Sequence, residues 1–116
     1  MNANAAEQPW VQIAPGIRRQ TITTGPSMYQ MRARLDAGSR LPEHNHPQEQ
    51  VTHVVKGRLR LIVDGVAHEL TDGMSCYIQC DVRHCGETIE ETFVLDTFSP
   101  PREDYLTADR AAVAAQ

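Results

Sequence analysis

The chain has 116 residues, a formal net charge of −4 and no block of like charges, which excludes the basic surface typical of nucleic-acid-binding proteins. Hydrophobic residues make up 41% and charged residues 22%, values close to the globular average that argue against wholesale disorder. No apolar run approaches the roughly 18 to 20 residues needed to cross a bilayer, so we expect neither a nucleic acid nor a membrane as a partner.

Short segments separated by turn signals follow one another from Trp10 onwards. Glycine, proline and aspartate mark turns at intervals of roughly 8 to 12 residues, a spacing typical of an all-β sandwich or barrel. We expect residues 1–9 to form a flexible segment, because they are polar and rich in alanine. Residues 10–106 are expected to form one barrel domain, and residues 107–116 a short helix or a frayed tail.

Strand-like alternation is clearest in residues 28–35. One face of that segment is formed by Tyr29, Met31, Ala33 and Leu35. Residues 58–63 and 66–70 flank Asp64-Gly65, a two-residue turn that predicts a β-hairpin. Residues 91–98 form another β-branched and aromatic run, which predicts a strand near the end of the barrel.

The stretch EHNHPQEQVTH, residues 43–53, concentrates side chains that commonly bind metals. His44 and His46 are two residues apart, so in an extended segment both imidazoles lie on one face and form a chelating pair. Gln50 has the same parity, whereas His53 has the opposite parity unless a β-bulge intervenes. The stretch therefore indicates part of a metal site whose remaining ligand lies elsewhere in the chain. The plainer alternative is a set of surface histidines near turns.

Two spaced patterns resemble the motifs of the cupin family. The first motif is similar to the segment that runs from Gly38 to Gly57. In it, five residues separate Gly38 from His44-x-His46, three more precede Gln50, and six precede Gly57; Gln50 stands where glutamate is usual. The second motif is similar to the segment that runs from Gly73 to His84. In it, five residues separate Gly73 from Gln79-Cys80-Asp81, and two more precede His84; the proline and the second glycine of the motif are replaced here. The resemblance extends over roughly residues 28–98.

This resemblance implies an all-β double-stranded β-helix, or jelly-roll barrel, that binds one divalent metal ion per chain. The implied ligands are His44, His46, Gln50 and His84. All four are neutral, so the ion would keep its full charge and act as a strong Lewis acid. Imidazole ligands suit Zn, Ni, Fe, Mn or Cu, and the sequence does not choose among them.

Residues 10–20 and 94–106 are similar to a subgroup of small cupins that act in pectin and uronate degradation, where a cupin opens the ring of an unsaturated galacturonate to a linear keto-acid. The resemblance implies functional roles for Asp96, Phe98 and Arg102. Asp96 would move a proton, Arg102 would hold a carboxylate and Phe98 would wall the pocket. The alternatives are a strand-end hydrogen-bonding role for Asp96 and a surface salt bridge for Arg102.

We therefore interpret the chain as a metal-dependent enzyme with lyase or isomerase-like chemistry on a small carboxylated sugar or keto-acid. A metal-dependent dioxygenase and a non-catalytic module that binds metal or small molecules remain open alternatives. We expect a cytoplasmic location, because the start lacks the features of a secretory signal, and a homodimer, because so small a domain leaves much surface to bury.

Two further groups of residues are open to more than one interpretation. Arg32 and Arg34 share a strand face, which could bind a substrate carboxylate or simply be solvated. The three cysteines lie within ten residues of one another, and we expect small buried hydrophobic side chains rather than a disulfide framework at Cys76, Cys80 and Cys85.

Overall fold

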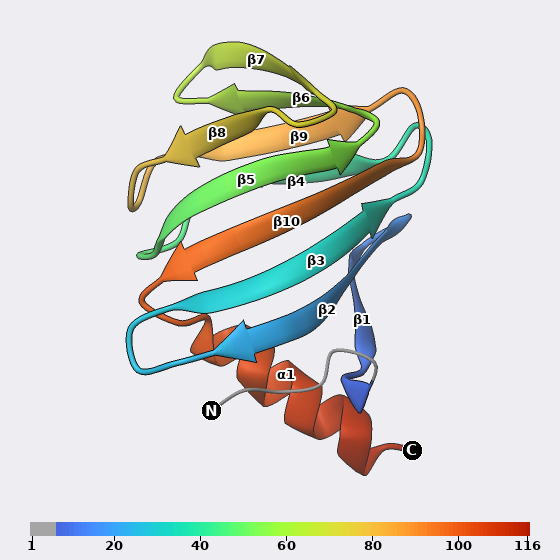
Figure 1. The fold of residues 1–116 in the computed structure, drawn as a ribbon, viewed down its shortest axis with the longest axis vertical. Coiled ribbons are helices and arrows are strands. Elements are labelled where there is room, and N and C mark those ends of the chain that lie inside the picture. Colours follow the sequence, from blue (N-terminus) through green and yellow to red (C-terminus); the bar gives the residue numbers. More distant parts are fainter. Residues whose placement is uncertain (1–6) are drawn as a thin grey trace.

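Residues 7–116 are described by a computed structural model, in which ten strands and one helix form (Figure 1). Residues 1–6 of the segment expected to be flexible lie outside this described part. The elements are β1 (Trp10–Ala14), β2 (Ile17–Thr24), β3 (Tyr29–Leu35), β4 (Arg40–His44), β5 (Glu49–Lys56), β6 (Arg58–Val63), β7 (Val66–Thr71), β8 (Ser75–Ile78), β9 (His84–Thr88), β10 (Thr92–Ser99) and α1 (Glu103–Ala114).

The strands form two facing sheets, which together make a flattened barrel (Figure 1). The larger sheet has the order β1-β2-β3-β10-β5-β8 and the smaller one β4-β9-β6-β7, and the paired strands are antiparallel. The last strand, β10, is inserted between β3 and β5, so residues near the end of the chain lie beside the middle of the sheet. The all-β jelly-roll fold expected from the sequence is confirmed.

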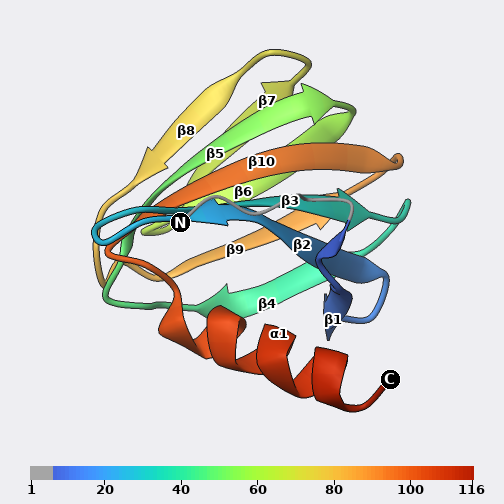
Figure 2. The same ribbon diagram turned by 60° about the horizontal axis from the view of Figure 1, so that its bottom comes forward.

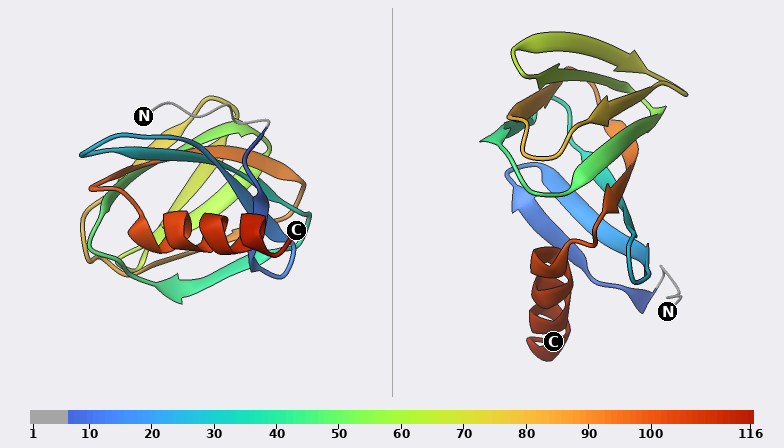
Figure 3. Two further views of the ribbon diagram at one scale, coloured as in Figure 1. Left: turned by 90° about the horizontal axis from the view of Figure 1, so that it is seen from below. Right: turned by 90° about the vertical axis from the view of Figure 1, so that its left-hand side faces the viewer.

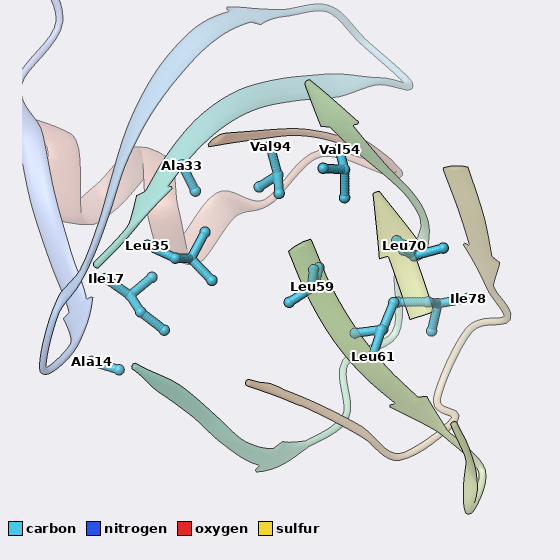
Figure 4. Packing of buried hydrophobic residues seen from close by; sticks show 10 residues of the cluster. All are labelled: Ala14, Ile17, Ala33, Leu35, Val54, Leu59, Leu61, Leu70, Ile78 and Val94. Carbon is cyan, nitrogen blue, oxygen red and sulfur yellow. The ribbon is translucent and has the colours of Figure 1, made fainter. Parts of the chain in front are cut away.

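The core fills the space between the sheets with aliphatic side chains from both of them (Figure 4). Strand β10 alternates strictly between buried and half-buried residues, as a strand with one face on a core should. Val94 belongs to the aliphatic core, whereas Phe98, four residues later, joins a separate cluster with Tyr29 and Met31. The interior thus changes from aliphatic to aromatic along β10.

Two tight turns follow the chemistry of their residues. The predicted hairpin joins β6 and β7, and Asp64 and Gly65 both have positive φ, as a type I′ turn requires. Gly57, between β5 and β6, has a φ of +117°, and a Cβ placed there would lie 2.7 Å from the carbonyl oxygen of Glu91. The glycine that ends the first motif is therefore required by both its backbone conformation and a close approach of the chain.

Helix α1 begins at Glu103, four residues before the segment in which a helix or frayed tail was expected. Pro100 and Pro101 end the preceding strand because neither can donate a backbone hydrogen bond, and the amide of Leu106 donates to the carbonyl of Arg102 as the first turn forms. Acidic residues in that first turn suit the positive end of the helix dipole. The helix therefore includes residues assigned from the sequence to the barrel domain.

A buried polar cluster fastens α1 to the barrel. In Figure 1 the helix lies beneath β1 and β2, and Figures 2 and 3 show it at the bottom end of the barrel, between the larger sheet and β4. Asp109 accepts hydrogen bonds from Arg19 Nη1 at 2.8 Å and from Thr21 Oγ1 at 2.6 Å. Thr21 is also hydrogen-bonded to the hydroxyl of Tyr29 at 2.6 Å. These contacts hold the middle of α1 against the barrel, and Tyr105 and Leu106 in its first turn pack against the aromatic cluster of the interior.

The cysteines are free, and their exposure differs from what was expected. Cys76 packs against the aliphatic core, and Cys85 is half-buried, but Cys80 is exposed because it lies in the turn between β8 and β9. Among residues 7–116, α1 is the only helix, and it is not long or apolar enough to span a membrane.

Candidate functional site

Three imidazoles converge at one end of the barrel interior. His44 ends β4 and is paired across the smaller sheet with His84, the first residue of β9, while His46 lies in the loop between β4 and β5. The ring of His84 is 4.1 Å from that of His44 and 5.0 Å from that of His46, measured between centroids. One nitrogen of each residue lies within 4.8 Å of the others, a spacing that allows all three to bind one metal ion.

The backbone fixes which nitrogen each imidazole can offer. The Nδ1 atoms of His44, His46 and His84 lie 2.8, 3.0 and 2.9 Å from the carbonyl oxygens of residues 42, 48 and 82. Because a carbonyl only accepts, each Nδ1 must carry the proton, and each neutral ring therefore keeps its lone pair on Nε2. This arrangement, in which backbone carbonyls orient the rings, is typical of histidines that bind metals.

The charge states of His46 and His84 also suit a metal. Burial lowers the pKa of His84 to about 4, and the charges of the neighbouring histidines and of Arg102 lower it as well. The pKa of His46 is lowered by burial and by Arg102. Both imidazoles are consequently neutral near pH 7, the form that binds metal ions. Moreover, Nε2 of His84 is buried without a hydrogen-bond partner among the described residues, which is costly unless a cation lies there.

Gln50 approaches the triad from the opposite sheet. It lies on β5, is 7% exposed, and places its Oε1 3.0 Å from Nε2 of His46. Its Nε2 donates to Oγ1 of Thr52 at 2.9 Å, which orients the amide with the oxygen towards the histidines. Two lone pairs therefore face each other between His46 and Gln50, an arrangement that a shared cation would make favourable. The donor set as a whole fits a divalent metal with three imidazole ligands and one amide oxygen.

Asp96 is a buried carboxyl group on the same side of the interior as Gln50. It lies on β10 directly across from Thr52, and its Oδ1 has no hydrogen-bond partner among residues 7–116. Burial raises its pKa to about 6, although hydrogen bonds from Thr52 and Gln50 and the charge of Arg102 act in the opposite direction. This carboxyl group can therefore gain or lose a proton near neutral pH.

Arg102 reaches the same cavity from the start of α1. It is 6% exposed, and its Cζ lies 3.8 Å from the ring centroid of Tyr105 and 4.8 Å from that of Phe98. It forms a salt bridge with Asp104, one of the roles considered from the sequence, but from a buried position rather than at the surface. One cavity is lined partly by aliphatic side chains of the core and partly by polar and aromatic residues, which include His44, Gln50, His84, Asp96, Phe98, Arg102 and Tyr105.

The structure separates other candidate residues from this cavity. Arg32 and Arg34 point away from the interior, and Arg34 pairs on the surface with Glu91. His53 bonds to Ser75 at 2.7 Å and lies on the outer face, as its parity predicted.

Sequence reasoning did not single out Tyr105 and Thr52, which contact the site residues directly. Tyr105 comes three residues after Arg102, on the same face of a helix, and this spacing was the one local signal that could have found it.

Comparison with known proteins agrees with this geometry. The family model described as "Cupin domain" matches residues 31–97. The pectin degradation protein KdgF of Dickeya dadantii (strain 3937) is 29% identical over 102 residues, which are 86% of this chain and 93% of that protein. The crystal structure of an RmlC-like cupin from Shewanella frigidimarina NCIMB 400 has a TM-score of 0.83 and 30% identity, and the match covers 90% of this chain and 94% of that one. The structure of KdgF from Halomonas sp. has a TM-score of 0.81 and 26% identity, and the match covers 90% of this chain and 96% of that one.

Proposed function

Since the chain belongs to the cupin family, we propose that it is a metal-dependent enzyme that opens the ring of an unsaturated uronate, a lyase or isomerase-like reaction on a small carboxylated sugar. The observation that carries this proposal is a cavity lined by His44, His84, a buried carboxyl group and a buried guanidinium, with His46 completing the histidine triad beside it. The similarity to a protein named for pectin degradation supports the same substrate class.

His44, His46, His84 and Gln50 would hold the ion. A divalent metal bound there supplies Lewis acidity, which polarises a substrate oxygen. The four protein ligands carry no charge, so the surrounding carboxyl and guanidinium groups set the electrostatic balance of the site.

Ring opening of a 4,5-unsaturated uronate breaks the bond between C1 and the ring oxygen, removes the proton of the C1 hydroxyl and adds a proton at C4. The product is an isomer, so the reaction needs no oxidant or reductant. Asp96 suits the transfer of that proton, because its pKa of about 6 allows the carboxyl group to accept and release it near neutral pH. Arg102 would bind the substrate carboxylate, and Phe98 would cover the ring and exclude water.

The test begins with the elemental composition of protein purified without an affinity tag. The metal-loaded protein is then mixed with unsaturated galacturonate, and NMR follows the loss of the vinylic C4 proton. We expect turnover by the wild type and a loss of about 100-fold or more in Asp96→Asn and Arg102→Met. Arg34→Met is the matched control, because it removes an exposed arginine from the outer face of the barrel.

Metal-loaded wild type that leaves the uronate unchanged would contradict the proposed reaction. The two alternative functions give other results in the same preparation. A dioxygenase would consume oxygen with iron bound and not with zinc. A binding module would show no turnover, while Asp96 and Arg102 variants would still change the affinity for a ligand.

We also propose that the chain is a cytoplasmic homodimer. The outer face of the larger sheet exposes large apolar side chains on neighbouring strands, among them Val51, Val55 and Tyr77, and pairing would cover them. Light scattering of the purified protein at micromolar concentration tests this expectation, and a monomeric mass would contradict it.

A further inference from the structure

Arg102 is held by neighbours on several sides. Its Nε and Nη2 donate to the two carboxylate oxygens of Asp104, at 3.0 and 2.9 Å. The rings of Tyr105 and Phe98 lie within 5 Å of its Cζ, at 3.8 and 4.8 Å. A buried guanidinium with both its edge and its face in contact has little freedom to adopt another rotamer.

The pairing with Asp104 occupies only one edge of the guanidinium. An arginine side chain carries five N–H donors in a plane, and Asp104 takes the Nε donor and one donor of Nη2. Both donors of Nη1 and the second donor of Nη2 lie at the end of the side chain, and a hydrogen bond with the Tyr105 hydroxyl also engages this guanidinium. This end can still bind a second carboxylate through two parallel hydrogen bonds.

Tyr105 is itself supported by the cluster that fastens α1. The Cζ of Arg19 lies 4.2 Å from its ring centroid, and Nη2 of Arg19 donates to its backbone carbonyl at 3.1 Å. Arg19 is in turn paired with Asp109 and is fully buried. The ring of Tyr105 therefore contacts two guanidinium groups, one of which is fixed to the barrel.

We propose that Asp104 and Tyr105 are positioning residues, which hold Arg102 as a rigid anchor that binds the substrate carboxylate through its end. This inference rests on the proposed function, because it takes the substrate to be a carboxylate. Asp104 fixes the rotation of the guanidinium plane through two hydrogen bonds, and Tyr105 fixes its position through stacking. The substrate carboxylate then meets an anchor that is already ordered and does not have to be immobilised on binding.

The kinetic test compares two neighbouring acids in the first turn of α1. Asp104→Ala removes the partner of Arg102, and we expect KM for the uronate to rise about tenfold or more while kcat changes by less than about threefold. Glu103→Ala is the matched control, because it removes the same charge from an exposed side chain that makes no hydrogen bond or ion pair within residues 7–116. Its KM should stay within about twofold of wild type.

Tyr105 is tested by a graded pair of substitutions. Tyr105→Leu removes the aromatic surface and should raise KM about as much as Asp104→Ala, whereas Tyr105→Phe keeps the ring and should recover most of that loss. A purely structural role for Tyr105 would lower kcat, metal content and stability together without a selective rise in KM. That result, or equal effects of Leu and Phe, would overturn the role of Tyr105.

A readout without turnover separates this inference from the proposed function. The Nε–H proton of Arg102 should exchange slowly with water in wild type and in Glu103→Ala, because it is buried and bonded to Asp104, and rapidly in Asp104→Ala. Galacturonate should shift its NMR signal in wild type.

If the wild type turns over no uronate, the proposed function fails. The hydrogen exchange of the Arg102 Nε–H proton and the galacturonate titration then decide whether Asp104 and Tyr105 position Arg102. Equal exchange in wild type and Asp104→Ala, or a galacturonate titration without any shift, would overturn it. A KM that falls in Asp104→Ala would also overturn it, because Asp104 would then be a competitor of the substrate.

Discussion

Asp109 offers the sharpest test of how α1 is attached to the barrel. Its carboxylate accepts hydrogen bonds from Arg19 at 2.8 Å and from Thr21 at 2.6 Å, and the Arg19 side chain is 0% exposed. Asp109→Ala would leave a buried guanidinium with the carbonyl of Tyr105 as its remaining hydrogen-bond acceptor among residues 7–116. Removing one partner of a buried ion pair costs about 3 to 5 kcal/mol, because the desolvated charge loses its compensation.

That loss is a large part of the total stability of a domain, which is about 5 to 15 kcal/mol. Urea unfolding of the metal-free protein measures it through the shift of the midpoint at constant slope. Glu103→Ala, on the exposed side of the same helix, serves as the control and should change the free energy of unfolding by no more than about 1 kcal/mol, the size of its interaction with the helix dipole.

A double variant distinguishes an uncompensated charge from simple loss of packing. Arg19→Met combined with Asp109→Leu replaces the ion pair with apolar side chains of similar size, and such replacements are often neutral or stabilising. We therefore expect the double variant to be more stable than Asp109→Ala by about 2 kcal/mol or more. A single variant that loses less than about 1 kcal/mol, or a double variant no better than the single one, would refute this account of the attachment.

Three further predictions concern the interior and its turns. Because the pKa of His84 in the fold is lowered to about 4, the metal-free protein should lose stability as pH falls from about 6.5 towards 4, and His84→Gln should flatten this dependence in urea unfolding. The pKa of Asp96 is raised to about 6, so its ionised form destabilises the fold. Asp96→Asn should therefore raise the free energy of unfolding at about pH 7.5 by up to about 3 kcal/mol. This gain should vanish as the pH falls from about 6 to below 3.8. An unchanged difference across this range would argue against a buried, ionised carboxylate. Gly57→Ala should destabilise by more than about 2 kcal/mol in thermal or urea unfolding. Gly38 has a less extreme φ of +76° and open space around it, so Gly38→Ala should cost less than half as much.

The fold and the histidine pair could be predicted because their signals are local. Alternation in residues 28–35 marks the inward face of β3, and the parity argument separates Gln50, which faces inward, from His53, which does not. Gly57, the glycine that ends the first motif, lies at a backbone position that excludes a side chain. Each of these inferences depends on a few neighbouring residues, and tertiary contacts reinforced rather than opposed them.

The attachment of α1 could not be predicted, since its contacts join residues far apart in the chain. Arg19 and Asp109 are 90 positions apart, and nothing in either segment marks these two charges as partners. Residues 107–116 are rich in alanine and only weakly amphipathic, so their sequence gives little reason to bury Asp109. The pairing of Arg19 with Asp109 depends on where β10 ends and α1 begins. That position is determined by the insertion of β10 between β3 and β5.

Gln50 links the ligand set to the buried carboxyl group, and this link gives a physical reason for an amide where the first motif usually has a glutamate. Its oxygen faces His46 at 3.0 Å, while its nitrogen donates to Thr52 and its hydrogen bonding lowers the pKa of Asp96. A glutamate at this position would offer the same oxygen but no donor. It would also bring a second carboxylate next to Asp96 in a buried place, where like charges raise the pKa of each other. The proton on Asp96 would then be held too tightly to exchange near neutral pH, so an amide at position 50 keeps the proton of Asp96 mobile.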